Sequence, residues 1–312
     1  MRPTPALRQQ TRLPIIGAPM FLVSGPELVA AQCGAGIIGT FPSLNARPQE
    51  QLHEWITRIE TRLTAMRRAA PGAQVAPYGI NLIVHPSNAR WQGDLAICAE
   101  RQVPLLITSL HPPETVVRSA HAYGGQVYHD VTTVRHAKRA LDAGVDGLIL
   151  VAAGAGGHAG QLNPIALVNE IRAFYDGPLA LSGCISHGKD ILAAEALGCD
   201  FAYMGTRFIA TKESLASEAY REMVLTAQAT DVVYTSYFSG VSANYLKPSI
   251  EAAGLDLQQL QGQATGERKP WRDIWSAGQG VGASQEILAV EDLVALLEAE
   301  YREAKRALLR AS

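Results

Sequence analysis

The sequence lacks the features that mark secreted, membrane-spanning and disulfide-stabilised proteins. Its four cysteines, Cys33, Cys98, Cys184 and Cys199, stand singly without a CxxC pair, so we expect buried, reduced thiols rather than disulfides or a zinc site. No segment reaches about 18 consecutive apolar residues, and no apolar run of signal-peptide length follows the basic N-terminus. These absences predict a cytoplasmic protein without a membrane partner.

An excess of charge of one sign is also absent, since 27 Lys and Arg residues balance 29 Asp and Glu residues for a net charge of −2. A chain with this balance has no electrostatic reason to bind nucleic acid. It contains no HExxH motif and no other cluster with metal-ligand spacing, which disfavours a metal-dependent hydrolase. We therefore expect a small-molecule substrate and no metal, and the sequence leaves open whether the chain forms a homodimer.

The sequence does contain a regular alternation of short apolar runs and segments with helical periodicity. Eight predicted strands cover residues 13–20, 35–40, 75–84, 103–110, 126–132, 147–152, 178–185 and 201–206. Seven predicted helices cover residues 27–33, 49–68, 89–101, 114–123, 133–143, 165–175 and 188–197. Nearly continuous apolar strands are typical of parallel strands that are covered on both faces. We predict an α/β fold of the (β/α)8 TIM barrel type, with an open doubly wound sheet as the alternative.

The alternation stops after Thr206, which suggests three parts. Residues 1–210 would form the barrel core, and residues 211–286 would form an insertion after the eighth strand, with a helix at 215–229, an aromatic segment at 234–245 and a Gly/Gln loop at 261–267. Insertions at this point lie over the C-terminal face of a barrel, so we expect a lid there. Residues 287–312 would contain an amphipathic helix at 290–309 that completes the barrel.

Small residues at the ends of the last two strands predict a phosphate-binding site. Ser182-Gly183-Cys184 ends the seventh strand and Gly205-Thr206 ends the eighth, and the loops after these strands commonly bind phosphate in such barrels. Glycines allow close backbone approach, and hydroxyl and N–H groups donate to phosphate oxygens. The alternative is that these residues only make tight turns.

One histidine stands out because glycines and alanines surround it. His158 lies in Gly154-Ala155-Gly156-Gly157-His158-Ala159-Gly160, directly after the sixth strand. A histidine titrates near neutral pH, and catalytic residues of barrels lie at the C-terminal ends of strands. We therefore predict that His158 is catalytic, with a role in hydrogen bonding within its loop as the alternative.

Several motifs together resemble the nitronate monooxygenase family, once called 2-nitropropane dioxygenases, and its flavin-dependent enoyl reductase relatives. They are Gly17-Ala18-Pro19-Met20, Gly79-Ile80-Asn81-Leu82, Ala155-Gly156-Gly157-His158-Ala159-Gly160, Ser182-Gly183 and Met204-Gly205-Thr206-Arg207-Phe208, with a weaker likeness at 274–280. The resemblance implies a TIM barrel with non-covalent FMN and His158 as the catalytic residue. The cofactor-binding residues that it implies are Ala18, Pro19, Met20, Asn81, Asp130, Gly156, Gly157, Ser182, Gly183, Cys184, Gly205 and Thr206.

Two of these positions depart from the family pattern. Asp130 stands where many relatives have lysine, and a carboxylate there would change the electrostatics at the edge of the flavin ring. Cys184 stands where a second glycine is common, although its backbone N–H group is still available.

The resemblance implies FMN-dependent oxidation of alkyl nitronates by O2 to a carbonyl compound and nitrite. The alternative is an NAD(P)H-dependent flavin reductase of enoyl or related acyl thioesters carried by ACP or CoA. A flavin-binding sensor without turnover would not explain an open histidine beside the ring, and we rank it last.

Overall fold

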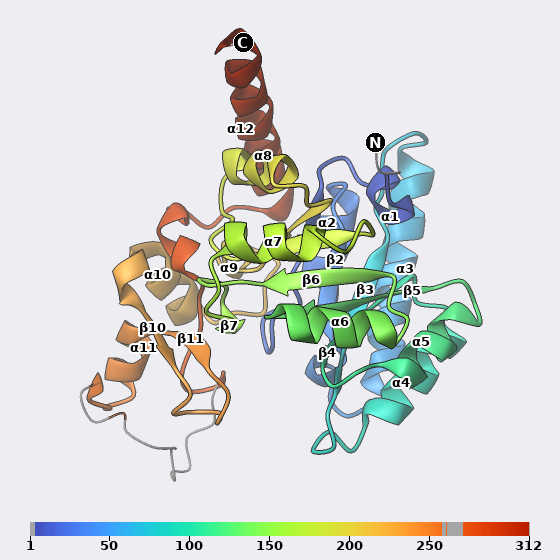
Figure 1. The fold of residues 1–312 in the computed structure, drawn as a ribbon, viewed down its shortest axis with the longest axis horizontal. Helices are drawn as coiled ribbons and strands as arrows, with labels where there is room; N and C mark the ends of the chain where they lie inside the picture. Colours follow the sequence, from blue (N-terminus) through green and yellow to red (C-terminus); the bar gives the residue numbers. More distant parts are fainter. Residues whose placement is uncertain (1–3, 258–259, 261–270, 312) are drawn as a thin grey trace.

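The computed structural model describes residues 4–257, 260 and 271–311, in which eight parallel strands form a ring (Figure 1). The strands run in the order β1-β9-β8-β6-β5-β4-β3-β2, and a bridge between Ile16 and Ile38 joins the two ends. Their bounds are β1 Ile15–Gly17, β2 Gly39–Pro42, β3 Tyr78–Val84, β4 Leu105–Leu110, β5 Gln126–Val131, β6 Gly147–Val151, β8 Leu179–Ser182 and β9 Phe201–Met204. The predicted (β/α)8 barrel is confirmed, and the open-sheet alternative is wrong.

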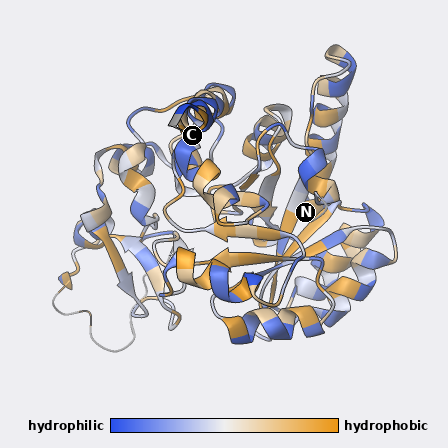
Figure 2. Ribbon diagram, turned by 45° about the horizontal axis from the view of Figure 1, so that its top comes forward, coloured by the Kyte–Doolittle hydropathy of each residue, from blue (hydrophilic) through white to orange (hydrophobic). Residues whose placement is uncertain are grey.

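Helices on the outside of the ring connect successive strands, as the crossover between parallel strands requires. They are α2 Pro26–Gly34, α3 Gln51–Ala69, α4 Trp91–Glu100, α5 Glu114–His121, α6 Val134–Asp142, α7 Pro164–Arg172 and α8 Gly188–Ala196. The hydropathy agrees with this arrangement of strands inside and helices outside. The strands are apolar along their length, whereas the helices mix apolar and polar residues (Figure 2). No helix in the described residues combines the length and apolar character that a bilayer crossing needs.

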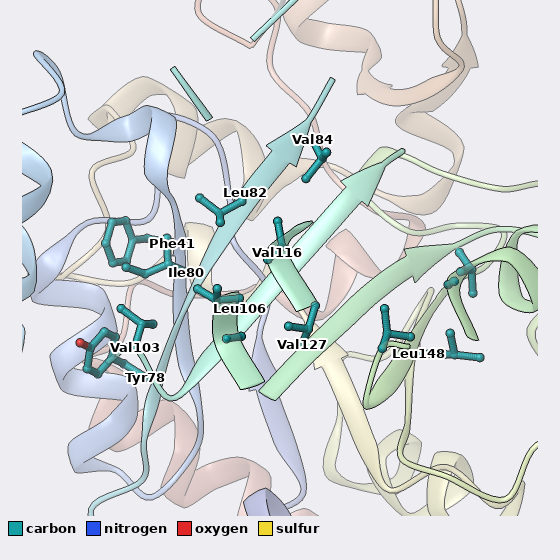
Figure 3. Close-up of a cluster of buried hydrophobic side chains, with 14 of the residues drawn as sticks. Phe41, Tyr78, Ile80, Leu82, Val84, Val103, Leu106, Val116, Val127 and Leu148 are labelled. Carbon is teal, nitrogen blue, oxygen red and sulfur yellow. The ribbon is translucent and has the colours of Figure 1, made fainter. Parts of the chain in front are cut away.

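The core has two layers because successive residues of a strand point to opposite faces. Ile80, Leu82, Leu106, Val127 and Leu148 belong to one buried cluster between strands and helices, and Figure 3 shows them along β3 to β6. A second cluster fills the barrel interior with Leu105, Ile107, Tyr128, Ile149 and Phe201, among others. The same alternation places three polar residues. Asn81 lies between the outward-facing Ile80 and Leu82, and Ser109 and Asp130 each follow an inward-facing residue by two positions. All three therefore face the barrel interior near the C-terminal ends of the strands.

The segment after β9 contains more structure than the sequence predicted. It comprises α9 Thr206–Ile209, α10 Glu218–Thr226, β10 Val232–Thr235, β11 Ala243–Leu246 and α11 Lys247–Ala252. The strands β10 and β11 form an antiparallel pair, and β11 also pairs with β7, Gly157–His158, from the loop after β6. The helix expected at 215–229 is the shorter α10, no strand was predicted in the aromatic segment, and the loop expected at 261–267 lies outside the described residues.

The C-terminal helix α12, Val290–Ala311, packs on the barrel along its first half. Val290, Leu293, Val294 and Leu297 are buried in a cluster with residues of α2, α8 and β9. Residues 305–310 are all exposed, and this end of the helix projects from the body in Figure 1. The part of α12 up to Tyr301 therefore contributes to the stability of the barrel through burial, whereas residues 305–310 do not.

We expect Leu297→Ala to lower the free energy of unfolding by about 2–5 kcal/mol, because it removes a fully buried side chain and leaves a cavity. The matched variant Leu308→Ala, whose side chain is 63% exposed, should change it by less than about 0.5 kcal/mol. Urea unfolding of both variants measures the difference. Equal losses would show that the projecting end also packs against something in solution.

Candidate active site

A cavity of about 1060 Å³ opens at the C-terminal ends of the barrel strands. Its volume lies at the upper end of the range for ligand sites in proteins, roughly 300–1000 Å³. The structure brings all thirteen residues predicted for the site to its lining, namely Ala18, Pro19, Met20, Asn81, Asp130, Gly156, Gly157, His158, Ser182, Gly183, Cys184, Gly205 and Thr206. Residues from at least six strand ends thus surround one volume, as expected when parallel strands close into a ring.

One side of the cavity is a cradle of backbone amides after β8 and β9. Gly183 has φ +129° and Cys184 has φ +57°, so two successive residues lie in the left-handed region. No hydrogen bond joins the N–H groups of Gly183, Cys184 or Gly205 to another described residue. Amides that are exposed in such a turn form a concave anion site.

Cys184 corrects one expectation from the sequence. Cys33, Cys98 and Cys199 are buried as predicted, but the Cys184 thiol is exposed. The reason is its place in the cradle, where it lines the cavity. A left-handed cysteine costs about 1 kcal/mol relative to an ordinary backbone conformation, a cost that glycine would avoid.

A segment near the C-terminus closes the cradle from outside the barrel. The Gly278 N–H donates to Thr206 Oγ1 (2.9 Å), and the Gln279 N–H donates to the Gly154 carbonyl (2.9 Å). A Cβ atom at Gly278 would lie 2.7 Å from the Gly154 oxygen, so only glycine fits there without displacing backbone. Sequence reasoning noted the likeness of 274–280 to the family but assigned it no site residue. Ser276, Ala277, Gly278 and Gly280 nevertheless line the cavity.

His158 is held by the segment that follows β9. His158 pairs with Ala243 of β11, and its imidazole ring packs edge-to-face against Trp271, with 5.3 Å between the ring centroids. His158 Nε2 lies 3.2 Å from Ser239 Oγ, and that hydroxyl donates to the Val241 carbonyl. The Ser239 hydroxyl proton is thus used in the bond to Val241, so Ser239 Oγ acts as an acceptor toward His158. We therefore assign the imidazole proton to Nε2, and Nδ1 keeps its lone pair.

The electrostatics of this ring suit a base. Burial lowers the pKa of His158 below its usual 6.5. The imidazole is therefore neutral at pH 7, although its surface remains accessible from the cavity. A neutral imidazole with a free Nδ1 lone pair can accept a proton.

The floor of the cavity is a short hydrogen-bond chain across three neighbouring strands. Asn81 Nδ2 donates to Ser109 Oγ (3.1 Å), and the Ser109 hydroxyl donates to Asp130 Oδ2 (2.6 Å). Burial raises the pKa of Asp130 to about 7, an effect that the Ser109 hydrogen bond partly offsets. Tyr203 of β9 completes this layer. Sequence reasoning missed Ser109 and Tyr203, although their alternation with outward-facing apolar residues was a usable signal.

His129, the residue before Asp130, also lines the cavity and is hydrogen-bonded to Thr108 Oγ1 through Nδ1 (2.7 Å). Burial, with a smaller effect of His136, lowers the pKa of His129 to about 4. Its ring is therefore neutral at pH 7. Since Nδ1 already has this partner, His158 is the better candidate for a base.

The lining fits the flavin mononucleotide that the sequence resemblance implies. The free amides of the cradle can bind its phosphate, and Gly157 and Gly205 leave space for close approach of a flat ring. Asp130 Oδ1 is buried without a partner in the described residues, as expected of a group whose partner is a ligand.

Comparisons with known proteins agree with this picture. A family model described as nitronate monooxygenase matches residues 6–300. A nitronate monooxygenase from Pseudomonas aeruginosa is 30% identical over 279 residues, covering 75% of this chain and 76% of that protein. An octahydro-1H-indene-4-carboxyl-CoA dehydrogenase from Rhodococcus jostii is 25% identical, and the match covers 76% of this chain and 63% of that relative, which is less than two thirds of its length. The solved structure of FabK from Thermotoga maritima has a TM-score of 0.81 and 25% identity, covering 98% of this chain and 97% of that chain.

The cradle generates a test of where the cofactor binds. A Cβ atom at Gly205 would meet its nearest neighbours at 3.5 Å, so Gly205→Ala should fold normally and still bind FMN. The larger side chain of Gly205→Leu would project into the cavity, and we expect it to abolish the retention of FMN through purification. Absorbance of the bound flavin and thermal unfolding measure the two effects. Full retention of FMN in a folded Gly205→Leu variant would place the phosphate elsewhere.

Proposed function

The chain belongs to the nitronate monooxygenase family of flavin-dependent oxidoreductases, and on this premise we propose that it uses FMN to oxidise alkyl nitronates with O2 to a carbonyl compound and nitrite. The observation that carries the proposal is His158, a neutral histidine on the lining of a cavity that fits FMN, whose Nδ1 has no hydrogen-bond partner among the described residues. The relative named nitronate monooxygenase, which is 30% identical over three quarters of this chain, supports it.

The residues of this chain would divide the work as follows. Bound FMN supplies the electron transfer and the oxygen chemistry. The cradle of Gly183, Cys184 and Gly205 would hold its phosphate, and Asn81 would contact the polar edge of its ring. His158 Nδ1 removes a proton from the carbon next to the nitro group when the substrate arrives as a neutral nitroalkane, and the resulting imidazolium stabilises the nitronate.

We further propose that residues 211–286 act as a lid. The strand β11 in this segment pairs with β7, which carries His158, and Tyr234 Oη donates to the Ala159 carbonyl (2.8 Å). Tyr234, Val241, Ser242 and Trp271 line the cavity, so this segment shields the reaction from water while it orients the histidine.

An NAD(P)H-dependent reductase of enoyl or related acyl thioesters is the second candidate. The specific observation in its favour is the rim of the cavity, where the exposed apolar side chains of Leu110, Leu162 and Val241 could contact an acyl chain. Arg139 also lines the cavity and has no ion-pair partner in the described residues, so it could bind a phosphate of a CoA or ACP carrier. The Rhodococcus relative named as a carboxyl-CoA dehydrogenase supports this candidate.

We expect His158→Gln to lower kcat/KM for a neutral nitroalkane by about 10²-fold or more, because the general base is lost. FMN content should remain unchanged, since His158 is not part of the phosphate cradle. His53→Gln is the matched control, because His53 lies outside the cavity on α3, and it should leave turnover unaltered. Equal turnover in His158→Gln and the wild type would remove His158 from the mechanism.

The pH dependence follows from the direction of the pKa shift. Because burial lowers the pKa of His158, the neutral base persists below pH 6.5. The kcat/KM for a neutral nitroalkane should therefore fall at acid pH with a midpoint below pH 6.5. This acid limb should be absent when the preformed nitronate is the substrate, because no proton has to be removed. A limb with its midpoint above pH 6.5 that vanishes in His158→Gln would contradict the shift.

Anaerobic mixing separates the two candidate functions. The flavin absorbance should bleach on addition of a nitronate and stay unchanged with NADH or NADPH. Bleaching by NADH or NADPH alone would favour the reductase, and its acyl thioester substrates would then be tested by reoxidation. A purified protein without flavin would overturn both candidates.

A further inference from the structure

The carboxyl group of Asp130 lies on the cavity floor and forms no ion pair with any described residue. The interior residues of its neighbours are Asn81 on β3, Ser109 on β4 and Ile149 on β6, and Tyr203 faces it from β9. None of these groups is a cation. His129, the adjacent residue, bonds Thr108 and is neutral at pH 7, while burial and the nearby carboxylate raise the pKa of Tyr203. Burial is the main cause of the raised pKa of Asp130, the Ser109 hydrogen bond partly offsets it, and His136 and Arg139 line the same cavity nearer its rim.

We assign the position of a proton on Asp130 from the pattern of its hydrogen bonds. Asn81 Nδ2 can only donate, so Ser109 Oγ accepts from it. The hydroxyl of Ser109 has a single proton, which it donates to Asp130 Oδ2. Because Oδ2 is an acceptor, the proton of a neutral Asp130 lies on Oδ1, the buried oxygen that has no partner among the described residues. Oδ1 thus becomes a donor without a partner among the described residues, on a carboxyl group that lines the cavity.

We propose that Asp130 is a proton-bearing hydrogen-bond donor to the ring of bound FMN, and that FMN binding takes up one proton from solvent at Asp130 Oδ1. The proposal rests on the proposed function in taking FMN as the cofactor, and it holds for either candidate reaction. The carbonyl oxygens and unprotonated nitrogens of the flavin ring are acceptors, which match a protonated Oδ1. An ionised Oδ1 would face them as a second acceptor, with a buried charge that no cation balances.

Binding should shift the carboxyl group further toward its neutral form. A ring on the floor of the cavity displaces the water that still reaches Asp130, and loss of solvent disfavours the charged state. The pKa of the free protein's Asp130 is about 7, so the group is mostly neutral at pH 6 and mostly ionised at pH 8. Above pH 7 the proton must be supplied on binding, and the affinity for FMN should fall by up to about tenfold per pH unit.

Isothermal titration calorimetry of FMN into the flavin-free full-length chain tests this directly. Titrations in two buffers of different ionisation enthalpy, at pH 6 and pH 8, give the number of protons taken up. We expect an uptake that approaches one proton at pH 8, a much smaller uptake by Asp130 at pH 6, and an affinity for FMN that decreases from pH 7 to pH 9. At pH 8 free FMN phosphate, with its second pKa near 6, is already a dianion and releases no proton on binding.

Asp130→Asn is the matched control because it keeps the shape and a neutral donor but cannot titrate. This variant should bind FMN without proton uptake at pH 8, and with the same affinity from pH 7 to pH 9. Ser109→Ala is the second variant. It removes the hydrogen bond that favours the carboxylate, so the pH at which the affinity begins to fall should move upward.

The outcomes separate the inference from the proposed function. Binding of FMN to the wild type at pH 8 without proton uptake, or with proton release, overturns the role of Asp130 and leaves the function intact. Uptake that persists in Asp130→Asn assigns the proton to another group and also overturns the inference. If Asp130→Asn fails to bind FMN, the Ser109→Ala variant provides the test. An upward shift of the pH at which its affinity for FMN begins to fall supports the inference, and no shift overturns it. A wild-type chain that binds no FMN at either pH overturns the proposed cofactor, and with it both proposals.

Discussion

Closure of the parallel strands into a ring is the constraint on which the site depends. Each strand is buried on both faces, so its residues alternate between the helices and the barrel interior. All the strands also end at the same rim. Asn81, Ser109 and Asp130 lie far apart in the sequence, but the register of β3, β4 and β5 places them side by side across the floor. The same closure brings the cradle after β8 and β9 to the other side of the cavity.

The strand pattern was predictable because burial on both faces leaves a direct trace in the sequence. Strand ends were predicted too long, for example at 13–20 against β1 Ile15–Gly17, since apolar residues continue beyond the last ladder hydrogen bond. The hairpin of β10 and β11 was missed for the opposite reason. Its strands have four residues each, and one of its partners is the two-residue strand β7, so the pairing depends on contacts distant in sequence.

The residues of the candidate site divide in the same way. Residues within a local motif, such as Gly205 or His158, could be identified from the sequence and do line the cavity. Gly278 could not, because its importance arises from its contact with Gly154 and Thr206, two segments from other parts of the chain. Ser239, which is hydrogen-bonded to His158, is one of three serines in the aromatic segment at 234–245, and nothing in the sequence around it indicates this partner.

The charge of the cavity explains how these parts work together. FMN carries a phosphate and a nitronate is an anion, so the two ligands of the proposed reaction are both negative. The site meets this with backbone amides in the cradle and with two titratable groups, His158 and Asp130, that burial holds toward their neutral forms.

A lysine at position 130 would attract an anion to the floor and hold it there at all relevant pH values. A neutral acid can bind the ring through one proton without adding charge. When a neutral nitroalkane is the substrate, the nitronate that forms is stabilised by the imidazolium of His158, which exists only after that histidine has accepted a proton, and Arg139 is a further cation on the lining of the cavity. In this arrangement the positive charge develops beside the substrate during the reaction instead of being fixed beneath the ring, and electrostatic stabilisation is concentrated where the reacting carbon lies.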